Sequence, residues 1–260
     1  MTDRDTFRRD QMRKGVYLLP NLLTTANLFC GFYAIIAAMK GRYEIAAIAV
    51  IIAVALDSLD GRIARMTNTT SRFGAEYDSL CDLVAFGVTP ALLIYSWSLS
   101  SYGKWGWLGA FLFAVCGALR LARFNVQIGS MDSRFFNGLP IPGGAAVVAT
   151  GILLYYYLGG EGVFAHLAIL IGIVALALLM VSSVKYYSFK DLNFFSRKPF
   201  MSFVLIILIL VVIVAEPQIM LFTFAFGYSL TGPLWGIYQT VRRWLGVKAK
   251  KPVYQPDSTL

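Results

Sequence analysis

Residues 57–82 read DSLDGRIARMTNTTSRFGAEYDSLCD, and four aspartates stand in this stretch at helical spacings. Asp57 and Asp60 are three residues apart, so they share one face of a helix. Asp78 and Asp82 are four residues apart and share a face in the same way. Two helices joined by so short a link are expected to be antiparallel neighbours, which brings both carboxylate faces together.

The composition around this stretch is that of an integral membrane protein. Of the 260 residues, 58% are hydrophobic and only 14% are charged, which is more apolar and less charged than an ordinary soluble domain. The net charge of +9 is common in membrane proteins, and we expect no nucleic-acid partner. Cys30, Cys81 and Cys116 all lie in apolar stretches, which favours reduced structural thiols over a disulfide framework.

Eight apolar runs are each long enough, or nearly so, to cross a bilayer as a helix. They cover residues 22–40, 44–63, 76–98, 105–124, 143–160, 164–184, 200–215 and 218–238. Lys and Arg gather before the first run and after the second, fourth, sixth and eighth. Because cytoplasmic loops carry the excess of Lys and Arg, we expect an all-α membrane protein of about eight transmembrane helices with both termini cytoplasmic.

The two ends of the chain are basic. Residues 1–19 mix basic and apolar side chains, and two interpretations stand: an interfacial amphipathic helix or a tail that only sets topology. Pro20 is expected near the start of the first spanning helix. Residues 241–260 are expected to form a solvated cytoplasmic tail. A cleavable signal peptide is not expected, because the first apolar run is long and lacks a cleavage pattern.

The four aspartates need compensation at this depth. A carboxylate in hydrocarbon costs roughly 2.5–3.5 kcal/mol, and mutual repulsion adds to that cost. An all-oxygen ligand set favours Mg²⁺ or Mn²⁺ over zinc. Asp57 lies about 12 Å from the helix end near Arg65 at ~1.5 Å per residue, close to the level of lipid phosphates. A structural alternative is an interfacial salt-bridge network with Arg62, Arg65 and Arg72.

The pattern D-x2-D-G-x2-A-R-x8-G-x3-D-x3-D resembles the signature of the CDP-alcohol phosphotransferases, and no position departs from it. The specified positions are Asp57, Asp60, Gly61, Ala64, Arg65, Gly74, Asp78 and Asp82. The resemblance implies a helical membrane fold with a six-helix catalytic core, here residues 20–184, which is commonly homodimeric. It also implies two divalent cations, Mg²⁺ or Mn²⁺, that bind a CDP-linked lipid.

The resemblance further implies a role for each carboxylate. Asp57, Asp60 and Asp78 would hold the first cation. Asp60, Asp78 and Asp82 would hold the second. Asp82 would also be the catalytic general base, activating an alcohol that attacks the phosphorus next to the lipid and expels CMP. Two cations neutralise charge on a diphosphate while a carboxylate accepts the hydroxyl proton, so the chemistry agrees with the residue types.

Three further segments resemble the integral-membrane phosphatidylserine synthases within this family. They are PNLLTTANLFCGF at 20–32, LRLARFN at 119–125 and FNGLPIPGGAA at 136–146. This resemblance implies transfer of the phosphatidyl group of CDP-diacylglycerol to L-serine. Residues 185–240 look like the two additional helices that some of these synthases carry. We expect a bacterial cytoplasmic membrane with the active site facing the cytoplasm.

A polar stripe on the first apolar run is a candidate surface for the nucleotide. Thr24, Asn27 and Gly31 fall on one helix face, where they would reach cytidine and phosphates. Helix-to-helix hydrogen bonds within the bundle are the alternative. The expected CDP-lipid contacts are Thr24, Asn27, Gly61, Arg65, Ser71 and Gly74.

Arg120 and Arg123, with Asn125 nearby, are candidate serine ligands at the end of the fourth run. Two guanidinium groups suit a carboxylate, which serine has and glycerol or choline lacks. Arginines that only anchor a helix end at the interface are the alternative. His166, the single histidine, is expected on the far side, which favours direct displacement over a phosphohistidine intermediate.

Two rival functions remain open at this point. A sister enzyme would use the same machinery with glycerol 3-phosphate, inositol phosphate or choline as acceptor. An ion-coupled transporter also carries intramembrane carboxylates. The aspartates here cluster at one cytoplasmic mouth rather than at the midplane on broken helices, which favours an enzyme.

Overall fold

The computed structural model describes residues 3–66, 71–127, 135–187, 207 and 215–244. The α-helices are α1 (Asp3–Met39), α2 (Tyr43–Met66), α3 (Arg72–Asp82), α4 (Thr89–Trp97), α5 (Gly103–Gln127), α6 (Ile141–Tyr157), α7 (Leu167–Val181) and α10 (Pro217–Trp244). A π-helical segment η1 (Leu83–Val88) joins α3 to α4, and a 3₁₀ turn η2 (Leu99–Tyr102) precedes α5. The prediction that the fold is helical is therefore confirmed.

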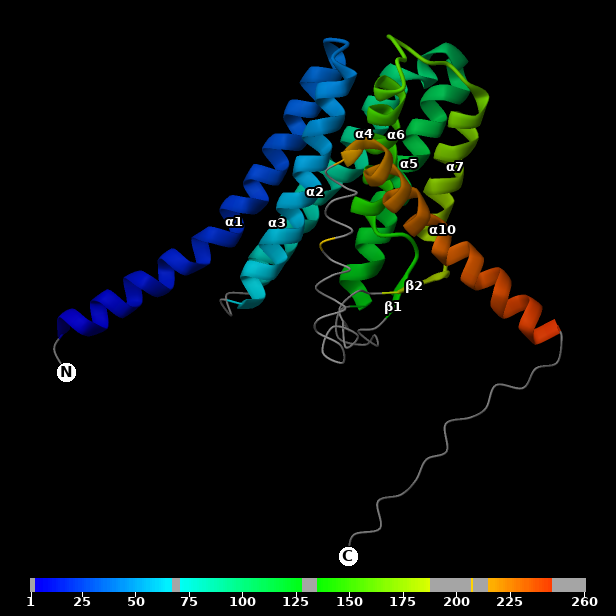
Figure 1. The fold of residues 1–260 in the computed structure, drawn as a ribbon. Coiled ribbons are helices and arrows are strands. Elements are labelled where there is room, and N and C mark those ends of the chain that lie inside the picture. The colour runs from blue at the N-terminus through cyan, green and yellow to red at the C-terminus, as the bar shows by residue number, and fades with distance from the viewer. Residues whose placement is uncertain (1–2, 67–70, 128–134, 188–206, 208–214, 245–260) are drawn as a thin grey trace, which may run out of the picture.

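The helices form a bundle in which α1 and α2 lie side by side at one edge (Figure 1). Helix α6 packs against both α2 and α10, and α5 packs against α7. Helix α3 makes its main contacts with α1 and η1, so α1 lies beside both α2 and α3. The two aspartate-bearing helices are thus held together largely through α1.

Two features differ from the expected pattern. Pro20 lies inside α1 rather than at its start, so the prediction that the helix begins there is wrong, although the stretch long and apolar enough to span a membrane does begin at Pro20. The first segment instead continues one helix from Asp3, at the cost of the hydrogen bond that the proline nitrogen cannot donate. A short antiparallel pair, β1 (Phe135–Asn137) with β2 (Lys185–Tyr187), also departs from a purely helical chain. It ties the segment before α6 to the segment after α7.

The neighbouring helices α1 and α2 bury mostly small apolar residues. These buried positions are Ala34, Ala37, Ala38, Ala46, Ala47, Ala49, Val50 and Ala53. Small side chains let two helix backbones approach closely, which is how helices pack where lipid removes most of the hydrophobic driving force. This close packing fixes the axial position of α1 relative to the aspartates of α2.

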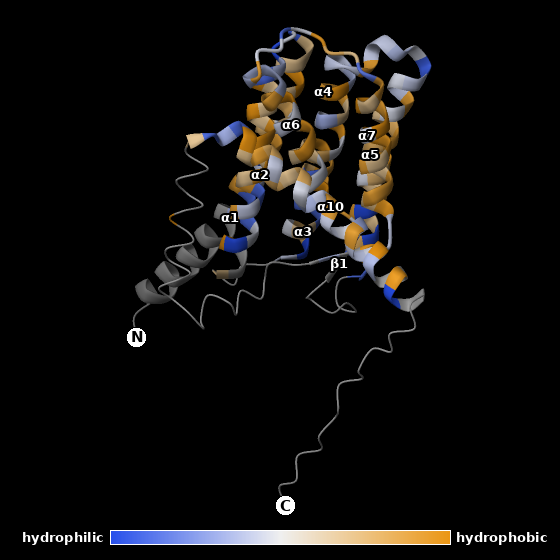
Figure 2. Ribbon diagram, turned by 45° about the vertical axis from the view of Figure 1, so that its right-hand side comes forward, coloured by the Kyte–Doolittle hydropathy of each residue, from blue (hydrophilic) through white to orange (hydrophobic). Residues whose placement is uncertain are grey.

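The outward faces of the bundle are apolar. Phe29, Trp105, Phe111 and Ile171 are all more than half exposed. Figure 2 shows hydrophobic residues over the helices and hydrophilic residues gathered toward their ends. Three helical stretches are long and apolar enough to cross a membrane by length and composition: Pro20–Met39, Arg72–Trp97 and Leu99–Gln127. Helices α6 and α7 are apolar but shorter.

The π-helical segment follows directly after Asp82. Pro90, in the first turn of α4, has no N–H to donate and its ring crowds the preceding turn. The helix widens there: the Thr89 backbone N–H bonds to the carbonyl of Val84, five residues back. The Thr89 hydroxyl bonds to the carbonyls of Val84 and Gly31, at 2.8 and 3.1 Å. Such single-turn π segments occur frequently at functional sites.

Candidate active site

The aspartates of α2 and α3 converge as predicted. Asp57, Asp60 and Asp78 each present a carboxylate oxygen within 4.8 Å of the others. Asp82 lies close enough to Asp57, Asp60 and Asp78 to interact with them electrostatically. Asp60 and Asp82 are buried, and the other two are half-buried. Four acidic groups thus share one region at the α1, α2 and α3 junction.

Two polar residues of α1 hold the most buried carboxylates. The Thr24 hydroxyl lies 3.1 Å from Asp60 Oδ2 and donates to it. The Asn27 amide nitrogen donates to Asp82 Oδ1 at 3.2 Å. Thr24 is 4% exposed and Asn27 is fully buried, so neither bond competes with bulk water. Thr24 and Asn27 therefore make helix-to-helix hydrogen bonds, the alternative considered for this stripe, and these bonds orient the aspartates. Their contact with the nucleotide stays a prediction.

The site retains acceptor atoms that the protein does not satisfy. Among the described residues, Asn27 Oδ1 and Asp78 Oδ1 are buried without a hydrogen-bond partner. Buried polar atoms are normally paired, because an unpaired one keeps the full cost of leaving water. Clustered carboxylate and amide oxygens are the ligands that Mg²⁺ and Mn²⁺ prefer. The residues present therefore fit a divalent cation.

Gly31 sets how closely α1 approaches the segment after Asp82. A Cβ at Gly31 would lie 2.8 Å from the Ala85 Cα, closer than side-chain carbons approach backbone. Gly31 stands one turn after Asn27 and Ala85 stands three residues after Asp82. The close contact therefore brings the Asn27 amide within reach of Asp82. Gly31, predicted as part of a ligand-facing stripe, is here a packing position.

The other predicted CDP-lipid contacts lie around the start of α3 and the end of α2. The Ser71 hydroxyl accepts a hydrogen bond from the Gly74 N–H at 3.0 Å and caps α3. A Cβ at Gly74 would lie 3.1 Å from that hydroxyl oxygen, so a larger residue would disturb the cap. Gly61 faces open space, with nothing within 4 Å of an added Cβ. Arg65 belongs to α2, but its side chain is outside the described part of the structure.

The three predicted serine ligands have different surroundings. Arg120 on α5 interacts electrostatically with Asp57 and Asp82, so it faces the aspartate cluster. Arg123 Nη1 donates to the Val181 carbonyl at 3.2 Å, at the end of α7. Asn125 and the Ser79 hydroxyl share hydrogen bonds at 3.0 and 3.3 Å between α5 and α3.

Arg120 is thus the one of the three with electrostatic contact to the aspartates. Arg123 and Asn125 tie neighbouring helices to α5, and their role as serine ligands stays a prediction.

The salt-bridge alternative is disfavoured by burial. Arg62 and Arg72 are exposed, whereas Asp60 and Asp82 are buried. A network of surface arginines would leave the buried carboxylates without a close positive charge. Among the side chains that the structure describes, the cation that interacts with Asp57 and Asp82 is Arg120, on another helix. The side chain of Arg65 lies outside that part.

Tyr228 on α10 also interacts electrostatically with Arg120 and was not predicted from the sequence. Tyrosines near the ends of apolar runs are usually interfacial anchors, and no motif distinguishes this one. Only the packing of α10 against α6 brings it to the site.

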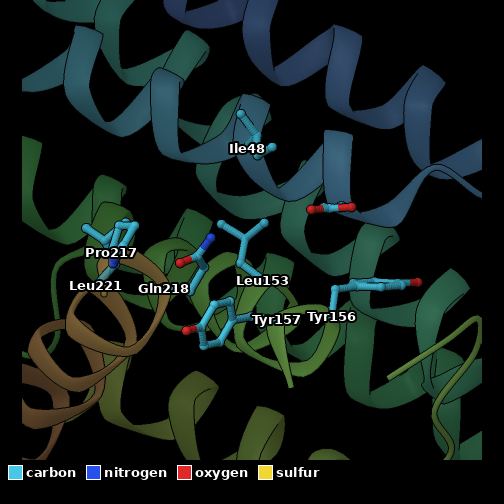
Figure 3. A pocket seen from close by; sticks show the side chains of 8 residues that line it. Ile48, Leu153, Tyr156, Tyr157, Pro217, Gln218 and Leu221 are labelled. Atoms are coloured by element: carbon cyan, nitrogen blue, oxygen red, sulfur yellow. The ribbon is translucent and has the colours of Figure 1, made fainter. Parts of the chain in front are cut away.

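A separate cavity of about 300 Å³ lies at the opposite end of α2 (Figure 3). Its lining residues are Glu44, Ile48, Leu153, Tyr156, Tyr157, Pro217, Gln218 and Leu221. The Tyr157 hydroxyl beside it donates to the carboxylate of Glu216. Glu44 is about 20 Å from Asp57 along the helix axis, at ~1.5 Å per residue, so this cavity is distinct from the acidic site.

Residues 17–181 match the family described as CDP-alcohol phosphatidyltransferase. The chain belongs to this family. All four aspartates and the Arg120 to Asn125 segment lie inside the matched range, whereas α10 follows it. The predicted family resemblance is confirmed.

Several curated family members are similar over much of this chain. CDP-diacylglycerol–serine O-phosphatidyltransferase of Helicobacter pylori J99 is 37% identical over 232 residues, which is 87% of this chain and 94% of that protein. The protein of the same name from Mycobacterium tuberculosis H37Rv is 43% identical over 159 residues, 58% of this chain and 54% of its own. Archaetidylserine synthase of Methanothermobacter thermautotrophicus is 38% identical over 170 residues, 65% of this chain and 69% of its own.

Proposed function

We propose that this enzyme transfers the phosphatidyl group of CDP-diacylglycerol to the hydroxyl of L-serine, releasing CMP and forming phosphatidylserine. The observation that carries the proposal is the convergence of Asp57, Asp60 and Asp78 within 4.8 Å in an apolar helical bundle. The bacterial relatives named as serine phosphatidyltransferases, similar over most of this chain, support serine as the acceptor.

We propose that the aspartates hold two divalent cations, Mg²⁺ or Mn²⁺. Asp57, Asp60 and Asp78 would bind one, and Asp60, Asp78 and Asp82 the other. Bound cations of this kind neutralise negative charge on the diphosphate of a nucleotide-linked lipid. Thr24 and Asn27 support this role, because their hydrogen bonds fix the Asp60 and Asp82 carboxylates before substrate binds.

Asp82 is proposed as the general base. A serine hydroxyl is a weak nucleophile at neutral pH, so a carboxylate within hydrogen-bond reach must accept its proton as the oxygen attacks phosphorus. The Asn27 amide donates to Oδ1 of Asp82 and so helps to orient this carboxylate. Arg120 is proposed to bind the serine carboxylate, since a guanidinium presents several N–H donors in one plane.

The remaining nucleotide contacts are proposed at Gly61, Arg65, Ser71 and Gly74. The open space at Gly61 allows a ligand to approach the α2 backbone closely. The Ser71 cap orients the first N–H groups of α3, and a helix N-terminus favours a phosphate.

We further propose eight spans, with a six-helix catalytic core at residues 20–184, two additional helices at 185–240 and both termini cytoplasmic. Residues 1–19 and 241–260 would be a basic N-terminal segment and a basic tail. The proposed location is a bacterial cytoplasmic membrane with the active site facing the cytoplasm, and the proposed assembly is a homodimer. The alternating basic loops support the orientation.

The proposal is tested by assaying the purified protein, in detergent or liposomes, with several acceptor alcohols. CMP release is followed with CDP-diacylglycerol and, in separate reactions, L-serine, glycerol 3-phosphate, inositol phosphate and choline, with Mg²⁺ or Mn²⁺. Release that depends on L-serine supports the proposal. Release with another alcohol alone indicates a sister reaction. Solute flux without CMP release would indicate a transporter.

A further inference from the structure

The π-helical segment η1, which follows directly after Asp82, is approached closely by two other helices. On the side of α1, a Cβ at Gly31 would lie 2.8 Å from the Ala85 Cα. On the side of α5, a Cβ at Gly117 would lie 3.7 Å from the Gly87 Cα. Glycines at both contacts let the backbone of η1 come close to α1 and α5 at once. The position of η1 is therefore set by both helices.

One polar side chain connects the end of η1 to α1. Thr89 is fully buried, and its hydroxyl lies 2.8 Å from the Val84 carbonyl oxygen and 3.1 Å from the Gly31 carbonyl oxygen. A hydroxyl has one proton to donate, so these two acceptors share it in a three-centre bond. The Thr89 backbone N–H also bonds to the Val84 carbonyl. Thr89 thus closes the π turn through Val84 and fastens it to α1 through Gly31.

The width of this turn decides which way Asp82 faces. A π turn holds about one residue more than an α turn, so it rotates the helix before it against the helix after it by about 100°. Helix α4, after the turn, is anchored by the fully buried Leu93. Conversion to an α turn would therefore rotate Asp82 away from Asn27, whose amide donates to it at 3.2 Å. Asn27 stands one turn before Gly31 on α1, so both cross-helix bonds join the same two segments.

We propose that Thr89 is a positioning residue for Asp82: it holds the π turn against α1 and so keeps the Asp82 carboxylate beside Asn27. The inference rests on the proposed function, in which Asp82 accepts the proton of the acceptor hydroxyl. The hydrogen bonds that the structure shows for Thr89 go to backbone carbonyls, so Thr89 acts on Asp82 through the backbone. A general base must stay within hydrogen-bond reach of the proton that it accepts, and a misplacement of about 1 Å slows the reaction.

The experiment compares Thr89→Val and Thr89→Ser with Thr150→Val in the full-length protein. Thr150 on α6 is 2% exposed, and its hydroxyl bonds to the Ala146 and Val147 carbonyls of its own helix, so it is a matched control without a cross-helix bond. CMP release with CDP-diacylglycerol, L-serine and Mg²⁺ gives kcat and the KM for CDP-diacylglycerol. Thermal denaturation in detergent checks the folding of each variant.

Thr89→Val is expected to lower kcat about tenfold, as for the loss of one buried hydrogen bond, while the KM for CDP-diacylglycerol stays near wild type. Thr89→Ser keeps the hydroxyl and is expected to restore most of kcat, and Thr150→Val is expected to match the wild type. Wild-type kcat in Thr89→Val, or equal losses in Thr89→Val and Thr89→Ser, overturns the inference. This comparison decides by itself if the double variant described next does not fold.

A double-mutant cycle with Asn27→Leu separates positioning from a general loss of packing. If Thr89 acts through the bond between Asn27 and Asp82, Thr89→Val adds at most about twofold to the loss of kcat in Asn27→Leu. Damage to packing, or a smaller folded fraction, multiplies the two losses, and that result overturns the inference. If CMP release depends on another alcohol and not on L-serine, the proposed function fails. The cycle is then run with that alcohol, and the same outcomes decide the inference.

Discussion

The hydrogen bond from Asn27 to Asp82 provides a sharp test of how α1 supports catalysis. We predict that Asn27→Leu, which keeps the number and branching of the side-chain heavy atoms, lowers kcat for CMP release. The bond is 3.2 Å long and both partners are at most 9% exposed, so it is a buried bond to an ionisable group. Bonds of that kind contribute about 1.5–3 kcal/mol, which corresponds to a loss of about 10- to 150-fold.

The matched control is Thr25→Val on the same helix. Thr25 also links α1 to α3, through a 3.0 Å hydrogen bond to the Tyr77 hydroxyl, but it is exposed and contacts no aspartate. Initial rates are measured at saturating CDP-diacylglycerol and L-serine, and folding is checked by thermal denaturation in detergent. The control is expected to stay within about threefold of wild type. Wild-type kcat in Asn27→Leu, or an equal loss in Thr25→Val, would refute the reasoning.

Two further variants separate chemistry from packing. Asp82→Asn is expected to abolish turnover while CDP-diacylglycerol binding stays measurable, because an amide cannot accept the serine proton; normal turnover would reject the base assignment. Gly31→Ala is expected to lower the unfolding free energy by about 1–3 kcal/mol in a thermal or denaturant assay, since its Cβ would meet the Ala85 Cα at 2.8 Å. Unchanged stability would show that α1 and η1 separate easily.

The acidic site was largely predictable because its information is local. Three of the four aspartates meet within 4.8 Å, as spacing on two helices joined by a short link required. The helical fold class was also predictable from local information, the long apolar runs. The structure adds that α3 packs chiefly on α1, so Thr24 and Asn27 work as supports for the carboxylates rather than as an isolated stripe.

The features of the site that the sequence could not predict depend on contacts between distant segments. Arg120, Arg123 and Asn125 are close in sequence, yet their partners differ: Arg120 interacts with Asp57 and Asp82, Arg123 with the Val181 carbonyl and Asn125 with Ser79. These partners depend on how the helices pack, which the sequence of one helix does not show. Tyr228 reaches Arg120 through the packing of α10 on α6 and β2, which are distant in the sequence. The Thr89 hydroxyl, at the end of the π-helical segment, likewise bonds across to the distant Gly31 carbonyl.

The most direct measurement of the central claim is a Mn²⁺ titration followed by electron paramagnetic resonance, in the presence of CDP-diacylglycerol. Wild-type protein and Asp60→Asn are compared, because Asp60 is proposed to contact both ions while its Thr24 hydrogen bond survives in the amide. The wild type is expected to bind about two Mn²⁺ per chain, and the variant to bind at least about tenfold more weakly. Equal binding by both proteins, or none by the wild type, would contradict the assignment of these aspartates as a metal site.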